Sequence, residues 1–108
     1  MEANTPRVSI QRGVDMAFVT LNDKEILDEA AIKELEKSIM VLVDEADQRN
    51  MLLDFSNVKF MSSAFLGLLV KIHKHLRERG GELKIRNVDP KIFRVFEITR
   101  LNKVFDIA

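Results

Sequence analysis

The chain has 108 residues, enough for one hydrophobic core but not two, so we expect a single domain over residues 1–108. Basic and acidic residues number 17 each, and a formal net charge of zero gives no overall attraction to nucleic acid or anionic lipid. The absence of cysteine excludes disulfides, thiolate metal sites and a thiol nucleophile. No apolar run reaches the length needed to span a bilayer, and residues 1–12 do not resemble a signal peptide. We therefore expect a cytoplasmic protein with no membrane insertion and no nucleic-acid partner.

The first elements predicted are two short strands and a helix. Residues 8–10 and 16–21 are rich in strand formers and flank a turn-like segment, which predicts an antiparallel hairpin. A helix is predicted over residues 28–48, with Asp28 as N-cap and Glu29 in the first turn, where the helix dipole favours an acid. Its apolar residues recur at helical spacing, at Ala31, Leu35, Ile39, Leu42, Val43 and Ala46.

The middle of the chain combines a buried strand with a second helix. Residues 51–55 form a short, mainly apolar run bounded by polar residues, typical of a parallel strand covered on both faces. Residues 58–62 are interpreted as a loop, and residues 63–79 as a helix that ends at two glycines, Gly80 and Gly81. The apolar stripe of that helix contains Leu66, Leu69, Val70, His73 and Leu76.

In the last third of the chain, the alternation of residues 82–86 predicts a strand. Asp89 and Pro90 predict the start of a helix, with Asp89 as its cap. Ile92, Phe93, Val95, Phe96 and Ile98 should give that helix a broad apolar face. Residues 101–107 are expected to pack as one helical turn and an edge strand. The order of elements predicts an α/β domain with a mixed four- to five-stranded sheet, three main helices and a short C-terminal turn.

The sequence gives little support for catalysis or metal binding. His73 and His75 are the only histidines, and at spacing i and i+2 on a helix they face different sides, so they do not share a metal ion. No nucleophile elbow and no glycine-rich phosphate loop occurs. We therefore expect no enzymatic activity and no cofactor.

Two serines, Ser62 and Ser63, lie at the predicted start of the second helix. A serine hydroxyl at this place caps free backbone N–H groups. The same N–H groups and the helix dipole also favour a phosphate, so a phosphoserine fits there without disrupting the helix. Capping alone is the commoner role of such serines, and the residues by themselves favour it.

The segment from Asp54 to Gly67 resembles the signature of the STAS family in its anti-sigma-factor antagonist branch. That signature reads Asp-Leu/Phe-Ser-x-Val-x-Phe/Tyr-Met/Ile-Asp-Ser-Ser/Ala-Gly-Leu-Gly, and residues 54–61 match its first half position for position. Ser63, Leu66 and Gly67 match in the second half. The resemblance implies the STAS fold, and it implies a partner-contact surface built from the motif residues Asp54, Ser56, Asn57, Met61, Ser62, Ser63 and Phe65.

The resemblance further implies a switch with Ser63 as the phosphorylated serine. The unphosphorylated protein would bind an anti-sigma factor that is also an ATP-dependent serine kinase, and so release a sigma factor. Phosphorylation would dissolve the complex, and a metal-dependent serine phosphatase would reset it. Nucleotide and magnesium would belong to the partner.

Two positions depart from the family pattern. Ser62 stands where the family has an acid, which adds a second candidate hydroxyl for phosphorylation. Phe65 stands where the family has glycine; exposed, it would form an apolar contact patch with Met61, and buried, it would belong to the core. A STAS domain that only scaffolds a signalling or lipid-transport complex, without phosphorylation, is the alternative function.

Overall fold

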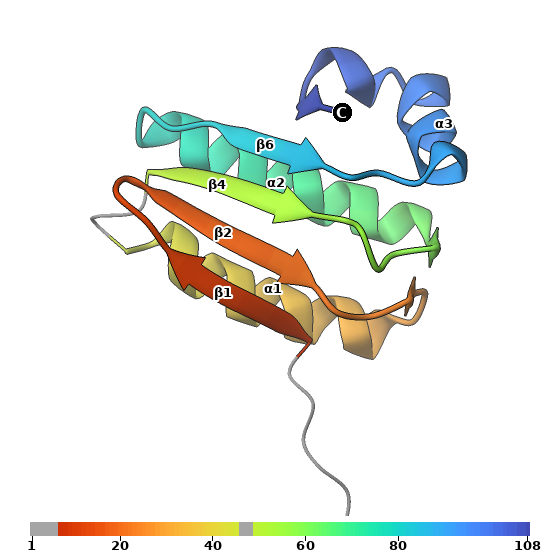
Figure 1. Ribbon diagram of the computed structural model, residues 1–108, viewed down its shortest axis with the longest axis horizontal. Coiled ribbons are helices and arrows are strands. Elements are labelled where there is room, and N and C mark those ends of the chain that lie inside the picture. Colours follow the sequence, from red (N-terminus) through yellow and green to blue (C-terminus); the bar gives the residue numbers. More distant parts are fainter. Residues whose placement is uncertain (1–6, 46–48) are drawn as a thin grey trace, which may run out of the picture.

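The computed structural model describes residues 7–45 and 49–108 and contains a five-stranded sheet with two helices packed on one of its faces (Figure 1). The predicted α/β architecture with a mixed sheet and three main helices is confirmed. In chain order the elements are β1 (Val8–Arg12), β2 (Met16–Leu21), β3 (Glu25–Ile26), α1 (Glu29–Val43), β4 (Asn50–Asp54), β5 (Phe60–Met61), α2 (Ser63–Glu78), β6 (Leu83–Arg86), α3 (Pro90–Ile98), a 3-10 turn η1 (Leu101–Lys103) and β7 (Asp106–Ile107).

The main sheet has the strand order β1-β2-β4-β6-β7. β1 and β2 form the predicted antiparallel hairpin, whereas β2, β4, β6 and β7 are parallel to one another. The register aligns Val19, Leu53 and Ile85 in one row, and all three side chains are buried against the helices. Parallel strands need crossover connections: α1 lies between β2 and β4, α2 between β4 and β6, and α3 with η1 between β6 and β7.

Helix α1 begins as predicted, because the Asp28 carboxylate accepts a hydrogen bond of 2.7 Å from the Ala31 N–H. Within the described residues the helix runs to Val43, and Asp44 caps it. The predicted end at Gln48, like Ala46, lies outside the described residues. The buried side of the helix contains Ala31, Ile32, Leu35, Ile39, Leu42 and Val43.

One predicted loop contains a strand. Within residues 58–62, Phe60 and Met61 form β5, which pairs in parallel with β3 in a separate two-stranded sheet. Two residues are too few to show the alternation by which a strand is identified, and the pairing is supplied by the remote Lys24–Ile26 segment. The small sheet ties the chain before α2 to the chain before α1.

The C-terminal part follows the prediction with one correction. Pro90 is the first residue of α3, and the Asp89 carboxylate accepts a hydrogen bond of 2.9 Å from the Lys91 N–H. Phe96 is fully buried, but Ile98, predicted on the apolar face, is 73% exposed because it lies on the side of this nine-residue helix that faces away from the core. The turn η1 and the edge strand β7 close the domain as expected.

A row of aromatic rings connects the C-terminal part to the helical layer. Phe55 lies 6.1 Å from Phe65 and 6.2 Å from Phe96, measured between ring centroids. Phe96 lies 6.0 Å from Phe105, and Phe105 meets the His73 ring edge to face at 5.5 Å. Edge-to-face contacts of this kind add to the burial energy of each ring.

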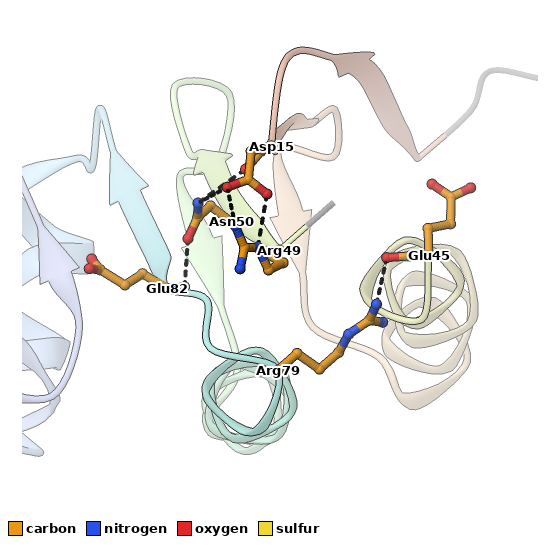
Figure 2. A network of polar contacts seen from close by, with 6 residues as sticks. All are labelled: Asp15, Glu45, Arg49, Asn50, Arg79 and Glu82. Carbon is orange, nitrogen blue, oxygen red and sulfur yellow. Dashed lines mark hydrogen bonds and ion pairs between the residues drawn. The ribbon is translucent and has the colours of Figure 1, made fainter. Parts of the chain in front are cut away.

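Polar side chains join the segments that precede the parallel strands (Figure 2). Arg49 donates two hydrogen bonds to the Asp15 carboxylate, at 3.2 and 3.3 Å. Asn50 donates to the Asp15 carbonyl oxygen at 3.1 Å and accepts from the Glu82 N–H at 2.9 Å. Arg79 donates to the carbonyl oxygens that end α1, including that of Glu45 at 2.9 Å. Hydrogen bonds thus connect the segments at the starts of β2, β4 and β6 with one another, and the end of α2 with the end of α1.

Gly81 is required at this same end of the sheet. A Cβ atom at Gly81 would lie 1.7 Å from the Arg49 carbonyl oxygen, far inside van der Waals contact. The preceding Gly80 has a φ of +79°, the left-handed conformation expected after a helix. The predicted role of the glycine pair as the end of α2 is confirmed. No helix among residues 7–45 and 49–108 combines the length and apolarity that a bilayer crossing requires.

Candidate functional site

The segment leading into α2 is held at three points. The Ser56 N–H donates to the Asp54 carboxylate at 2.9 Å, which closes a turn directly after β4. The Lys59 N–H then donates to the Lys24 carbonyl oxygen at 2.8 Å, and the Ser62 N–H to the Ile26 carbonyl oxygen at 2.9 Å. These bonds fix where α2 begins, so Ser63 is presented at a defined position as the first residue of a 16-residue helix.

The two serines have different environments. Ser63 is exposed. Ser62 occupies the N-cap position in an extended conformation, but its hydroxyl makes no capping bond. The Ser62 Oγ atom is instead buried without a hydrogen-bond partner among the described residues. The expectation that a serine here caps the helix is therefore wrong for Ser62, because its hydroxyl faces the protein interior.

Phe65 belongs to the core. Its side chain is fully buried, and its ring packs against Phe55. Of the two interpretations left open by the sequence, the structure selects the buried one, and Phe65 is corrected from a partner contact to a core residue. The backbone turns so that position 65, one turn into α2, points at the aromatic row and away from the surface.

Asp54 is the only titratable group among the seven predicted contact residues. Its carboxylate accepts hydrogen bonds from the Ser56 N–H and, at 3.2 Å, from Asn87. Partial burial alone would raise the pKa of Asp54, but the hydrogen bonds together outweigh it and place the pKa below its ordinary value. Asp54 thus stays ionised and organises the turn.

The remaining predicted residues form the rim of this end of the molecule. Ser56 and Asn57 are exposed, and Asn57 donates a hydrogen bond of 3.1 Å to the Leu21 carbonyl oxygen. Met61 is half-buried and packs on the core. Asp54 is the last residue of β4 and Ser63 is the first residue of α2, and the segment between them carries Ser56, Asn57, Met61 and Ser62.

A shallow groove next to Met61 escaped the sequence analysis. It measures about 370 Å³ and lies between the β3–β5 sheet and α3. Phe60 and Leu27 on its wall are 45% and 52% exposed. The Lys91 ammonium lies 5.1 Å from the Phe60 ring centroid. The groove is lined by Glu25, Leu27, Lys59, Phe60, Met61, Lys91, Ile92 and Val95.

The sequence held only a weak indication of this groove. Phe60 and Leu27 are apolar residues in segments too short for periodicity, and Ile92 and Val95 arrive from a remote helix. Lys59 pairs with Asp89 at 3.6 Å, so one charge of the rim is already partnered.

The histidines occupy the separate places that their spacing predicts. The His73 ring is partly buried against Phe105, and its Nδ1 atom has no hydrogen-bond partner in residues 7–45 and 49–108. Burial, with a smaller contribution from the nearby Arg77 charge, lowers the pKa of His73. Within the part of the chain that the structure describes, no three His, Cys, Asp or Glu side chains cluster as metal ligands would.

Comparison with known proteins identifies the family. The family model described as "STAS domain" matches residues 6–108. The chain is 36% identical over 73 residues to the anti-sigma-B factor antagonist of Bacillus subtilis, a match that covers 68% of this chain and only 64% of that protein. It is 33% identical over 81 residues to the anti-sigma-B factor antagonist of Staphylococcus aureus, covering 75% of this chain and 74% of that one.

Solved structures agree on the fold. The anti-sigma factor antagonist SpoIIAA in its unphosphorylated form superimposes with a TM-score of 0.79 at 19% identity, covering 94% of this chain and 87% of that chain. Its phosphorylated form, from Bacillus, superimposes with a TM-score of 0.73 at 18% identity, covering 94% and 90%. Anti-sigma factor antagonists are regulators and not enzymes, in line with the expectation from sequence. The chain therefore belongs to the STAS domain family, among the anti-sigma factor antagonists.

Proposed function

We propose that this protein is a phosphorylatable switch that binds an anti-sigma factor and leaves it when Ser63 is phosphorylated. The observation that carries the proposal is the exposure of Ser63 at the first residue of α2, beside a groove with exposed Phe60 and Leu27. The relatives named as antagonists of anti-sigma factors support the partner class, and the phosphorylated form of SpoIIAA supports the modification. The proposed partner is an anti-sigma factor with serine kinase activity in the cytoplasm.

The proposed chemistry favours Ser63 over Ser62 as the phosphate acceptor. A kinase must reach the hydroxyl oxygen, and Ser63 is exposed whereas the Ser62 Oγ atom is buried. A phosphate adds about −1.5 to −2 charges, which free N–H groups at a helix start can accommodate. The added charge would lie at the middle of the proposed contact surface and would oppose any partner group that packs there.

The contact surface that we propose joins the motif residues to the groove. Ser56, Asn57 and Ser63 supply polar contacts, with Asp54 and Ser62 beneath them, and Met61 and Phe60 supply apolar area. A polar rim around a small apolar centre is the usual composition of a protein interface. Resetting of the switch by a metal-dependent serine phosphatase completes the proposed cycle.

The first test is phosphopeptide mapping by mass spectrometry of the protein purified from its native cells. Phosphate on Ser63 is the expected result. Phosphate on Ser62 would move the site, and the complete absence of phosphate under all growth conditions would favour a scaffold role without phosphorylation.

The second test compares charge variants in pull-downs with the co-purifying anti-sigma factor. Ser63→Ala should keep binding and prevent release by ATP, whereas Ser63→Asp should weaken binding. Ser38→Asp is the matched control, because Ser38 is an exposed serine on α1, away from the proposed surface. Equal binding of the Ser63→Asp and Ser38→Asp variants would contradict the switch.

A further inference from the structure

A second groove lies on the helical side of the domain, between α1 and α2. The two helices pack side by side on one face of the sheet (Figure 1), and the groove between them measures about 480 Å³. It is separate from the Ser63 surface, since it shares no lining residue with the groove at Phe60. The lining residues are Lys33, Glu36, Lys37, Met40, Lys71 and His75.

Lysines stand on both walls of this groove, and His75 lies one turn from the lysine on α2. Lys33 and Lys37, four residues apart, form the wall on α1, and Lys71 and His75, also four residues apart, form the wall on α2. Side chains at this spacing lie on the same side of a helix, so each wall carries a row parallel to its helix axis.

The positive charge of the groove is not neutralised within the described part of the chain. Three lysines face one acid, Glu36, and Glu36 is engaged by Lys71. Lys33 and Lys37 form no ion pair with any described residue. Since the chain as a whole has a formal net charge of zero, this is a local excess of charge and not an overall one.

The floor of the groove is apolar. Met40 is half-buried there and packs on the core. Val41, one turn beyond Lys37 on the same helix, is 64% exposed and extends apolar surface from the α1 wall. An apolar floor beside the unpaired lysines of the α1 wall complements an amphipathic helix that carries acids along the edge of an apolar stripe.

We propose that the α1–α2 groove is a docking site for an acidic amphipathic helix of a protein partner. The concave shape favours a helix over a flat membrane surface, and the spacing of the cations predicts acids four residues apart on that helix. The site does not depend on the state of Ser63 or on the function proposed for it. The protein would thereby hold a second partner while the serine end is engaged.

The test uses a labelled, alanine-rich peptide of about five helical turns that carries leucines on one side and flanking glutamates four residues apart. Fluorescence anisotropy measures its affinity for the full chain, and two-dimensional NMR locates the shifted amides. We expect shifts at the lining residues and binding that weakens about tenfold in K33E/K37E, because two attractions become repulsions. R94E/K103E, which reverses two exposed cations outside the groove, should bind as the unchanged protein does.

Two further comparisons keep the proposal open to refutation. V41S, at an exposed position that cannot unfold the core, should weaken binding by about twofold to threefold through lost apolar contact. A peptide of the same composition in scrambled order should bind at least about fivefold more weakly. Equal binding of both peptides, or phosphatidylglycerol vesicles that shift the groove amides where the peptide does not, would overturn the proposal.

Discussion

The two ends of the parallel strands differ in how their polar groups are used. At the amino ends, Asp15 accepts hydrogen bonds from Arg49 and Asn50, Arg79 donates to backbone carbonyl oxygens at the end of α1 (Figure 2), and Gly81 fits where no side chain has room. At the carboxyl ends, the Ser62 hydroxyl is buried with no hydrogen-bond partner in the described part of the chain, and Ser63 and Phe60 are exposed. One end holds the chain together, and the other leaves groups available for a partner.

The helix α2 connects these two ends. Its first residue is Ser63, and its C-cap is Arg79. The Arg79 guanidinium donates hydrogen bonds to carbonyl oxygens at the end of α1. A side chain near the start of α2 can therefore be changed without touching the network that fixes its end. The proposed modification of Ser63 would therefore leave the hydrogen bonds at the opposite end of the sheet intact.

The largest expected effect comes from Phe65→Ala at the serine end. The side chain is fully buried, so its loss removes apolar burial and leaves a cavity beside Phe55. We expect the free energy of unfolding to fall by about 3–5 kcal/mol, measured by urea denaturation. A fall below about 1 kcal/mol would place Phe65 at the surface and restore it as a partner contact.

Gly81→Ala is the corresponding test at the network end. The new methyl group would collide with the Arg49 carbonyl oxygen, so the segments must move apart. We expect a loss of about 1–3 kcal/mol in the same assay, as for other overpacked sites. Gly67→Ala is the control, because a Cβ at this exposed helical position meets no atom and should stabilise α2 slightly.

An Asp54→Asn variant tests whether the ionised Asp54 carboxylate stabilises the turn that follows β4. The folded-state pKa of Asp54 is lowered, so its stabilising contribution is present above the unfolded value, about 3.9, and is lost as the pH falls through the lower folded value. We expect the wild type to be more stable at neutral pH by less than about 1 kcal/mol after solvent screening, and the difference to vanish in strong acid. A difference that is independent of pH would contradict the ionised carboxylate.

The smallest effect is expected from Ser62→Ala. An N-cap serine usually contributes about 1 kcal/mol, but the Ser62 hydroxyl makes no capping bond and is buried unpaired. We expect no loss of stability, or a gain of up to about 1 kcal/mol. Asp28→Ala is the control, since Asp28 caps α1 through the Ala31 N–H and should lose about 1 kcal/mol in thermal unfolding.

The sequence predicted the features that depend on local patterns. The caps at Asp28 and Asp89, the glycines after α2 and the parallel order of the strands all follow from spacing and residue type. Each of these features is decided by neighbours within about one helical turn or by the alternation of elements.

What the sequence did not reveal depends on remote segments. The burial of Phe65 is decided by Phe55 and by the arrival of Phe96, more than thirty residues later. The strand β5 exists only because the Lys24–Ile26 segment offers its carbonyl oxygens. The direction of the Ser62 hydroxyl and the groove at Phe60 likewise follow from tertiary packing, which no local pattern encodes.

The row of phenylalanine rings has an optical consequence. The chain contains seven phenylalanines and neither tryptophan nor tyrosine, so the protein has almost no intrinsic fluorescence of its own. Four of these rings pack against one another in the core, so loss of the near-ultraviolet circular dichroism of phenylalanine should report the unpacking of the aromatic row. Tryptophan emission from a partner protein can therefore be followed during binding against a dark background.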